Sequence, residues 1–332
     1  MTRIAIIGAG GWGKNHVRNF ASLGKLALVC DVAEDVRAQH AEEHPSVPVV
    51  ADFTKHLDDF DAAVVATDAP SHAEVATALL EADKDLLVEK PLALSGDDAR
   101  RLRDLARERG RVLMVGHLLL FHPVVQRLKT LVDEGELGDV LYIVSRRLNL
   151  GVVRRDENAW WSLAPHDLSI ANYLFDAAPT SVAASGGSFL QREVEDVVFA
   201  TVRYPGGRLA HVHVSWLDPH KTRMLTVVGT RKMAVFDDTS PDQKLVVFDK
   251  GVEPPSALTY SEGVRVRTGD IRIPAIRMDE PLRRECAAFL EAIGTRTPTL
   301  ADADSGVAVV EALEAGAASL AQGREVSTKV RP

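Results

Sequence analysis

The first apolar run of the chain leads directly into a glycine-rich turn, and this junction restricts the possible folds more than any other feature. Residues 4–7 form a four-residue apolar run typical of a buried strand. Gly8, Gly10 and Gly13 follow with the spacing GxGxxG, and a helix-compatible segment comes next. Gly8 permits a tight turn, Gly10 lets the backbone approach a pyrophosphate, and Gly13 lets helix and strand pack closely. The junction predicts a dinucleotide site with the diphosphate at a helix N-terminus.

Asp31 follows the next apolar run, residues 26–30, and bears on the type of dinucleotide. A carboxylate at this place accepts hydrogen bonds from both ribose hydroxyls and repels the 2′-phosphate of NADP, so we expect NAD. Arg37, in the following helix, could weaken this preference. An ordinary residue at the end of a strand is the alternative interpretation of Asp31.

Short apolar runs alternate with amphipathic segments through the first 120 residues. The expected strands are 4–7, 26–30, 62–66, 86–88 and 112–115, and the expected helices are 14–23, 34–43, 72–83 and 96–109. Apolar strands separated by helices predict a doubly wound parallel sheet of the Rossmann type in an α/β fold. Longer alternating runs follow at 140–147, 197–204, 208–216, 225–228 and 244–248. They predict an α+β domain with an open, mainly antiparallel sheet.

The chain of 332 residues is expected to form two domains, 1–120 and 121–332, with Pro123 opening a helix just after the boundary. Helical patterns at 279–293 and 302–321 close the chain, and we expect the last helix to pack back on the first domain. Residues 237–278 are rich in turn formers and are interpreted as hairpins and loops near a sheet edge.

Composition excludes several classes of partner. The chain has 39 Lys and Arg, 47 Asp and Glu and a net charge of −8, without a basic stripe for nucleic acid or an anionic membrane. Cys30 and Cys286 are isolated, which argues against a disulfide framework or a zinc site. Residues 1–12 lack the pattern of a signal peptide, and no apolar run is long enough to span a bilayer. These features predict a cytoplasmic protein.

The triplet Glu89-Lys90-Pro91 ends the apolar strand at 86–88. In an open parallel sheet, ligands bind at this carboxyl edge of the strands. A lysine at the nicotinamide end of the site can hydrogen-bond a substrate hydroxyl, and Lys90 is therefore a candidate catalytic residue.

Taken together, the GAGGWG opening, Ala66-Thr67 followed by His72, the Glu89-Lys90-Pro91 triplet and the antiparallel second domain resemble the Gfo/Idh/MocA oxidoreductases. The resemblance covers essentially the whole chain and implies a Rossmann domain followed by a sheet domain that often mediates oligomers. It predicts a homodimer or homotetramer formed through the C-terminal sheet. The expected cofactor-binding set is Gly8, Gly10, Gly11, Trp12, Gly13, Asp31, Thr67, His72 and Glu89. Trp12 either covers the cofactor or packs as an ordinary aromatic residue.

The same resemblance implies two catalytic residues. Lys90 matches the family's catalytic lysine, with a cis peptide expected between Lys90 and Pro91. His166 matches the histidine of a segment Asp-x-Gly-x-His, although Ser162 stands where the aspartate is usual. Asp167 or water must then replace that aspartate, or Lys90 carries less of the proton transfer. Imidazole titrates near neutral pH and suits a base for hydroxyl oxidation, but a helix cap or core residue is the alternative for His166.

Three further residues are candidate substrate ligands: His117, Arg154 and Asp167. His117 follows another strand and is expected at the same sheet edge, where it would touch the sugar or the nicotinamide. Arg154 could grip a diphosphate or a carboxylate, with a surface arginine as the alternative. His211 and His213 alternate along a strand without an obvious third ligand, and we predict no metal site.

The segments 149–151, 154–158 and 161–167 are similar to those of family members that oxidise C3 of UDP-N-acetylglucosamine or its uronate. We therefore expect an NAD-dependent dehydrogenase acting on a secondary hydroxyl of a sugar or nucleotide sugar at C3. Two alternatives remain open. One is a redox-neutral glycosidase that uses transient C3 oxidation, and the other is a non-catalytic NAD-binding regulatory protein.

Overall fold

The computed structural model describes residues 2–151, 153–154, 157–253 and 265–329. The chain forms two compact units, and each is built from two segments of the chain. The first unit consists of Met1–Phe121 and Asp279–Val310, and the second consists of His122–Met278 and Glu311–Pro332. Within the described part of the chain, no helix is both long and apolar enough to cross a membrane.

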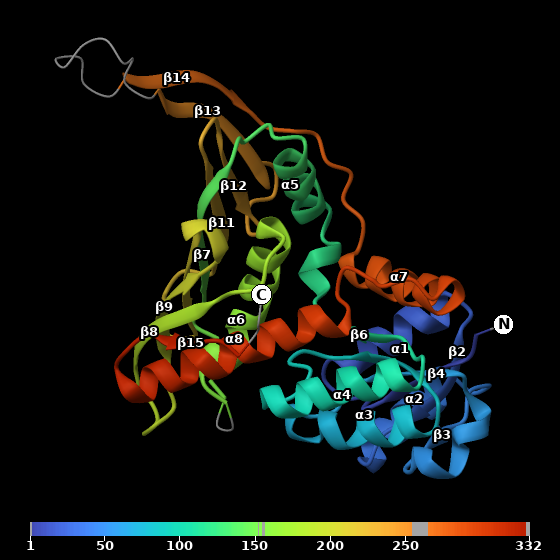
Figure 1. Ribbon diagram of the computed structural model, residues 1–332. Helices are drawn as coiled ribbons and strands as arrows, with labels where there is room; N and C mark the ends of the chain where they lie inside the picture. The colour runs from blue at the N-terminus through green and yellow to red at the C-terminus, as the bar shows by residue number, and fades with distance from the viewer. Residues whose placement is uncertain (1, 152, 155–156, 254–264, 330–332) are drawn as a thin grey trace. The chain divides into compact units, whose positions relative to one another are not determined.

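The first unit is built on a six-stranded parallel sheet with the strand order β3-β2-β1-β4-β5-β6. Its strands are β1 (Ile4–Ile7), β2 (Leu26–Cys30), β3 (Val49–Val50), β4 (Ala62–Val65), β5 (Asp85–Val88) and β6 (Leu113–Val115). The expected doubly wound Rossmann sheet is thus confirmed. Strands β1 and β4 are fully apolar and buried, because helices cover both faces of the sheet (Figure 1). The two-residue strand β3 is too short to give a sequence pattern.

The helices of this unit are α1 (Gly13–Ser22), α2 (Glu34–Glu43), α3 (His72–Glu81), α4 (Gly96–Glu108) and α7 (Pro281–Thr295). Helix α1 packs with α7, and α3 packs with α4. Ser95 caps α4 by accepting a hydrogen bond from the Asp98 amide, and Asp97 and Asp98 lie in the first turn, where the helix dipole favours acidic side chains. Short 3₁₀ helices occur at Phe53–Asp59, Ala69–Ser71 and Leu118–Phe121.

The second unit contains a nine-stranded sheet with the order β14-β13-β12-β11-β7-β10-β9-β8-β15. Its strands are β7 (Val140–Leu148), β8 (Ser181–Gly187), β9 (Val197–Arg203), β10 (Leu209–Ser215), β11 (Thr222–Gly229), β12 (Met233–Asp237), β13 (Leu245–Glu253), β14 (Arg265–Arg272) and β15 (Val326–Ser327). Strands β7 and β10 run parallel, and the other neighbouring pairs described are antiparallel. The mainly antiparallel second sheet is therefore confirmed.

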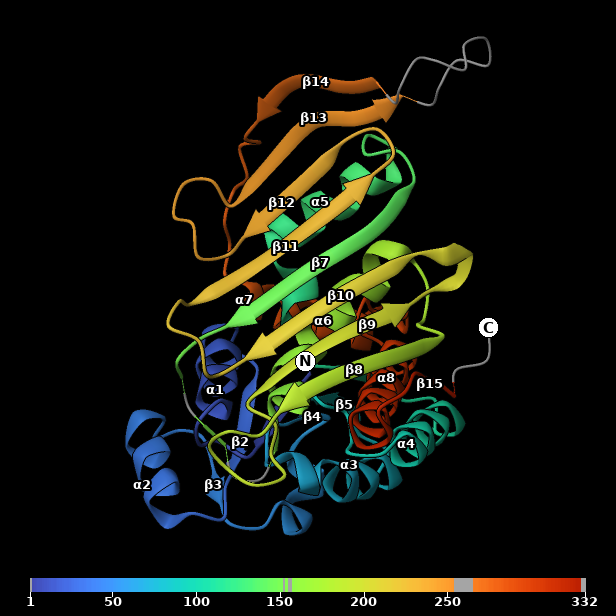
Figure 2. The same ribbon diagram turned by 90° about the vertical axis from the view of Figure 1, so that its left-hand side faces the viewer.

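Helices α5 (Pro123–Asp133) and α6 (Ala159–Phe175) cover one face of this sheet, as Figures 1 and 2 show, and α8 (Ala303–Gln322) closes the helical part of the chain. Pro123 begins α5 as expected, and the His122 side chain caps it. Trp160 of α6 is completely buried, and its indole N–H donates a hydrogen bond of 3.0 Å to the Leu313 carbonyl. Gly316 leaves room for this indole, since a Cβ there would lie 2.5 Å from the ring.

The opposite face of the sheet carries a mixture of apolar, aromatic and polar side chains. Tyr142 and Phe199 are 43% exposed there, and the Phe199 ring stacks on His213 of the neighbouring strand. Such a face would suit self-association. The homodimer or homotetramer stays a prediction.

Several elements were not anticipated from the sequence. Strands β8, β12 and β15 have no strand signal strong enough to stand out, and helix α6, which begins at Ala159, was not among the expected helices. The interpretation of His166 as a helix cap is wrong, because Asn158 caps α6 by accepting a hydrogen bond from the Trp161 amide. The hairpin expected within 237–278 is present as β13 and β14 at the sheet edge, and residues 254–264 lie outside the described residues.

Candidate functional site

The glycine-rich turn has no space for side chains at two of its positions. Gly8 has a φ of +85°, and a Cβ on it would lie 2.7 Å from the backbone of Ala66 and Thr67. A Cβ on Gly13 would lie 1.8 Å from the Gly8 carbonyl oxygen. The roles expected for Gly8 and Gly13 in the tight turn and the close packing of helix α1 therefore follow from the geometry.

Gly10 and Gly11 behave differently, because they border open space. A Cβ on Gly10 would meet its nearest neighbour, the Asp31 carboxylate, at 4.0 Å, and one on Gly11 would meet nothing within 4 Å. The N-cap residue of α1, Trp12, makes no capping hydrogen bond with its side chain, and none is present from the other described residues. An open backbone cradle at an uncapped helix N-terminus fits the diphosphate of a dinucleotide.

Asp31 lies directly after β2 and is fixed by backbone amides of two loops. Its carboxylate accepts hydrogen bonds from the Ala9 amide at 2.8 Å and the Ala33 amide at 2.9 Å. Each carboxylate oxygen keeps a further lone pair for a hydroxyl donor. The Arg37 guanidinium donates to the carbonyls of Asp31 and Val32, so its charge is engaged by the protein backbone.

Glu89 links the glycine-rich turn to the loop that carries Lys90. The Trp12 indole N–H donates to one Glu89 carboxylate oxygen at 2.7 Å, and His16 Nε2 lies 2.8 Å from the same oxygen. The other oxygen accepts the Lys90 amide at 3.2 Å. The Lys90–Pro91 peptide is cis, as the family resemblance implies. Glu89 and Trp12 thus hold the two loops together.

A second carboxyl group lies beside this cluster. Glu285 of α7 is completely buried, and neither of its oxygens has a hydrogen-bond partner among the described residues. Burial, together with the nearby Glu89 charge, raises the pKa of Glu285 well above its ordinary value. Burial also acts to raise the pKa of Glu89, but the His16 hydrogen bond and charge outweigh it and lower that pKa. One neutral acid therefore lies next to one ionised acid.

His72 connects the loop after β4 with the loop after β5. Its Nδ1 lies 2.8 Å from the Pro91 carbonyl oxygen and its Nε2 lies 3.0 Å from the Thr67 carbonyl oxygen. The Thr67 hydroxyl accepts a hydrogen bond from Ser71 at 2.7 Å. These contacts fix the shape of the sheet edge at which Lys90 lies.

His117 follows β6 at the same edge of the sheet. It is 1% exposed, and neither ring nitrogen has a hydrogen-bond partner in the part of the chain that the structure describes. Burial lowers the pKa of His117 to about 4, and the Glu89 and Lys90 charges act on it in opposite directions. The imidazole is therefore neutral at physiological pH and offers both a donor and an acceptor.

In the second unit, His166 and Arg154 line the same pocket of about 230 Å³. Its other lining residues are Arg147, Leu148, Asn149, Gly151, Ser162, Leu163, Ser215, Trp216, Lys221 and Arg223. Four of the lining side chains described are Lys or Arg, and none is a carboxylate. The pocket is therefore suited to an anionic ligand. Arg155 and Asp156, in the sequence segment next to Arg154, lie outside the described residues.

Asp167 is 3% exposed and does not itself line the pocket, but it is bonded to Arg147, which does. Its carboxylate accepts hydrogen bonds from the Ser145 hydroxyl at 2.6 Å and from the Arg147 guanidinium at 2.9 and 3.0 Å. Asp167 thus holds the Arg147 guanidinium at the pocket wall. Arg154 pairs with Glu157 at 3.0 Å and remains half exposed.

The partners of these residues carry little or no signal in the sequence. His16 lies one helical turn after Gly13, and this spacing from the glycine-rich turn could have pointed to it. Glu285 gave only the signal of an acidic residue on an apolar helix face, and Lys221 and Arg223 gave no signal beyond their charge. His211 and His213 lie on β10, and His213 is stacked against Phe199.

Gly10→Ala should separate cofactor binding from folding. The added methyl group has space in the protein alone, so the melting temperature should stay unchanged, but it fills the cradle for the diphosphate. We expect the affinity for NADH, measured by fluorescence titration, to fall at least about tenfold, or ~1.4 kcal/mol. Gly13→Ala is the comparison, because overpacking against Gly8 should destabilise the fold itself by about 1–3 kcal/mol. Unchanged NADH affinity in Gly10→Ala would contradict the assignment of the cradle.

The buried His117 makes stability depend on pH. Because its pKa is about 4 in the folded protein against 6.5 ordinarily, the unfolded chain binds the extra proton first as pH falls below 6.5. The contribution is fully present above pH 6.5 and is lost towards pH 4, by up to about 3 kcal/mol. His117→Leu should flatten this decline in urea unfolding measured between pH 6.5 and 4. Identical pH dependence in the two proteins would show that His117 is not buried as a neutral group.

Comparison with known proteins agrees with this architecture. Residues 2–117 match the Gfo/Idh/MocA model described as an oxidoreductase family with an NAD-binding Rossmann fold, and residues 125–235 match a C-terminal domain model of the same family. UDP-N-acetylglucosamine 3-dehydrogenase from Acidithiobacillus ferrooxidans is 27% identical, with 93% of this chain and 94% of the relative covered. A solved structure of that enzyme has a TM-score of 0.82 at 25% identity, covering 96% of this chain and 97% of that one.

Inositol 2-dehydrogenase from Mycolicibacterium smegmatis is similar to a comparable degree, at 28% identity over 99% of this chain and 96% of the relative. The two family models together span most of the chain, one on each side of the boundary between the units. The protein therefore belongs to the Gfo/Idh/MocA family of oxidoreductases, with an NAD-binding Rossmann domain at its N-terminus.

Proposed function

We propose that this protein is an NAD-dependent dehydrogenase that oxidises a secondary hydroxyl group, at C3, of a nucleotide-linked sugar. The observation that carries the proposal is the basic lining of the pocket that contains His166. The relatives described above are named for oxidation of a secondary alcohol on a ring, one on a nucleotide sugar and one on an inositol. The shared chemistry is oxidation of CH–OH to a ketone.

The pocket favours the nucleotide sugar over the inositol. An inositol is neutral, whereas a nucleotide sugar carries a diphosphate that needs cationic partners. Lys221 offers such a partner. Arg147 and Arg154 are paired with Asp167 and Glu157, but each keeps further guanidinium N–H groups that can donate to phosphate oxygens. A carboxylate on the sugar would be held by the same groups, so the uronate form is also accommodated by this chemistry.

The cofactor would be held by the open cradle of Gly10 and Gly11, the uncapped first turn of α1 and the free lone pairs of Asp31. The Asp31 charge disfavours a 2′-phosphate, and Arg37 is bound to backbone carbonyls, which supports NAD over NADP. When bound, NAD accepts the hydride from the carbinol carbon of the substrate.

His166 is assigned as the base that takes the hydroxyl proton as the carbonyl group forms. Lys90 is assigned to hydrogen-bond the same oxygen and to stabilise the negative charge that develops on it. The Glu89 carboxylate positions Lys90 by accepting a hydrogen bond from the Lys90 backbone amide. Asp167 positions Arg147, which lines the pocket. His117, neutral and buried at the sheet edge, is assigned to contact the sugar or the nicotinamide.

Lys90→Ala and His166→Ala should each lower kcat by roughly 10²- to 10⁴-fold with UDP-N-acetylglucosamine or its uronate as substrate. The Kd of NADH should stay within about threefold of wild type, because neither residue belongs to the diphosphate cradle. NADH formation is followed by absorbance, and the sugar product is analysed in parallel. Equal loss of NADH affinity would indicate a structural role, and release of free sugar without NADH would support the redox-neutral glycosidase instead.

The basic pocket gives a separate test of the substrate class. Lys221→Ala should raise the KM for a nucleotide sugar by roughly fivefold, or about 1 kcal/mol, and the effect should shrink at high salt. The kcat should change little, since this contact is made in both ground and transition states. Lys250→Ala, an exposed lysine that does not line the pocket, is the matched control. An unchanged KM would argue against an anionic substrate at this pocket.

A further inference from the structure

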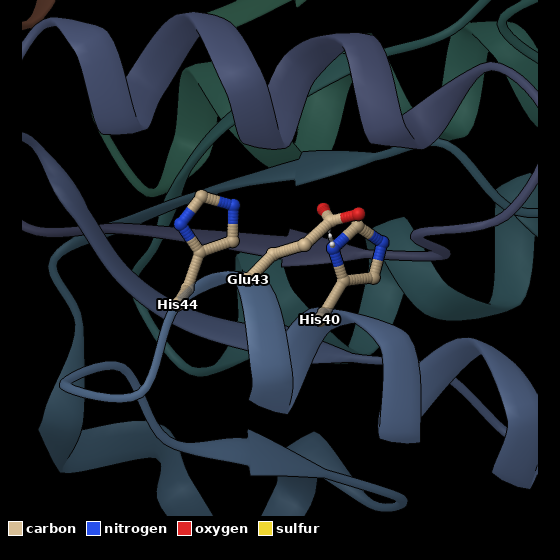
Figure 3. Close-up of side chains that lie close together, drawn as sticks. All are labelled: His40, Glu43 and His44. Atoms are coloured by element: carbon tan, nitrogen blue, oxygen red, sulfur yellow. Dashed lines mark ion pairs between the residues drawn. The ribbon is translucent and has the colours of Figure 1, made fainter.

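Two histidines and a glutamate lie together at the C-terminal end of α2. His40, Glu43 and His44 occupy positions i, i+3 and i+4, which bring side chains to one side of a helix. Each residue has one nitrogen or oxygen atom within 4.8 Å of those of the other two. Figure 3 shows the Glu43 carboxylate turned towards the His40 ring, with the His44 ring on its other side. The cluster belongs to no part of the site described above.

A hydrogen bond to the glycine-rich turn fixes the tautomer of His40. This side chain is 3% exposed, and its Nε2 lies 2.9 Å from the Ala9 carbonyl oxygen. A carbonyl only accepts, so Nε2 carries the hydrogen, and Nδ1 presents a lone pair in the neutral ring. Nδ1 is buried, has no hydrogen-bond partner among the described residues, and faces a Glu43 carboxylate oxygen at 3.8 Å. The lone pair and the carboxylate oxygen together offer two ligand atoms to a cation placed between them.

Glu43 and His44 complete the set from the solvent side. One Glu43 oxygen accepts a hydrogen bond from the Gln39 amide at 2.8 Å, which leaves the other oxygen directed at His40. His44 leaves the helical conformation, with φ −132° and ψ 63°, and its ring stacks against His40 with centroids 6.2 Å apart. The Glu43 side chain is 48% exposed, so that an ion can enter from solvent.

We propose that His40 Nδ1, the Glu43 carboxylate and His44 bind a divalent transition-metal ion of the zinc class. Two imidazoles and one carboxylate are ligands typical of Zn²⁺, Co²⁺ and Ni²⁺, whereas Ca²⁺ and Mg²⁺ require more oxygen ligands. A fourth position is left for water. The supporting contacts match those of metal sites, because a ligand histidine usually donates its other N–H to a carbonyl and a ligand carboxylate is itself hydrogen-bonded.

The site would act on the glycine-rich turn. An ion on Nδ1 fixes His40 in the form that donates to the Ala9 carbonyl, and the Ala9 amide in turn donates to Asp31. The metal would therefore hold the end of α2 against the turn that forms the cradle, without taking part in the redox chemistry. Occupancy should stabilise the folded protein by mass action.

The test uses full-length protein without a histidine tag, freed of metal with a chelator. Zn²⁺ binding is measured by calorimetry, and Co²⁺ is used as a probe because its visible absorption reports the ligand set. Wild type should bind one ion at the cluster. Glu43→Gln and His44→Ala should each weaken that binding at least about tenfold and abolish the rise in melting temperature that Zn²⁺ causes. Both side chains are partly exposed, so these variants should fold normally.

His56→Ala is the matched control, because His56 also lies near a carboxylate, with Nδ1 2.9 Å from Asp59. Its metal affinity should equal that of wild type. The proposal is overturned if wild type binds no Zn²⁺, or if Glu43→Gln and His44→Ala bind it as tightly as wild type does. Glu285→Gln tests the buried group of His16, Glu89 and Glu285, and loss of the ion in that variant alone would place the metal there instead.

Discussion

The packing of backbone against backbone at the glycine-rich turn constrains everything built around it. Gly13 leaves no room for a Cβ against the Gly8 carbonyl, and Gly8 leaves none against the residues that follow β4. Helix α1 can therefore start only where its N-terminus meets the end of β1. That placement leaves Gly10 and Gly11 beside open space and brings the Ala9 amide to Asp31. One steric constraint thus sets both the cradle and the carboxylate next to it.

Glu89 extends this constraint to the loop that carries Lys90. A mostly buried carboxylate must be paired, and its partners come from the turn, from helix α1 and from its own loop. Trp12, expected from the family resemblance to belong to the cofactor site, is also one of these partners. The neighbouring Glu285 avoids a second buried charge by staying protonated, which its raised pKa allows. Cofactor turn and catalytic loop are in this way parts of one hydrogen-bonded network.

The second unit positions charge by a different means. Helix α6 lies against the sheet, and its Asp167 is buried where Ser145 and Arg147 of β7 can reach it. The ion pair fixes Arg147 at the wall of the pocket. His166, on the same helix as Asp167, lines this pocket too. Strand β11 adds Arg223, and the loop before it adds Lys221. A rigid helix and three strands of one sheet therefore support a basic pocket whose sequence signals are scattered over 77 positions from Arg147 to Arg223.

Local sequence determined the parallel sheet and the glycine-rich turn, because each depends on neighbouring residues whose conformational preferences agree. The cis bond at Lys90–Pro91 was expected from the family resemblance alone. It also placed Asp31, Lys90 and His117 at strand ends, since parallel strands present their carboxyl ends at one edge. Only the tertiary structure decided the partners: His16 and Glu285 around Glu89, Arg147 on Asp167, and the Ala9 carbonyl on His40. These hydrogen bonds and buried contacts join residues that are far apart in the chain. The apolar pattern of a sequence reflects local secondary structure and does not indicate which distant residues will be in contact.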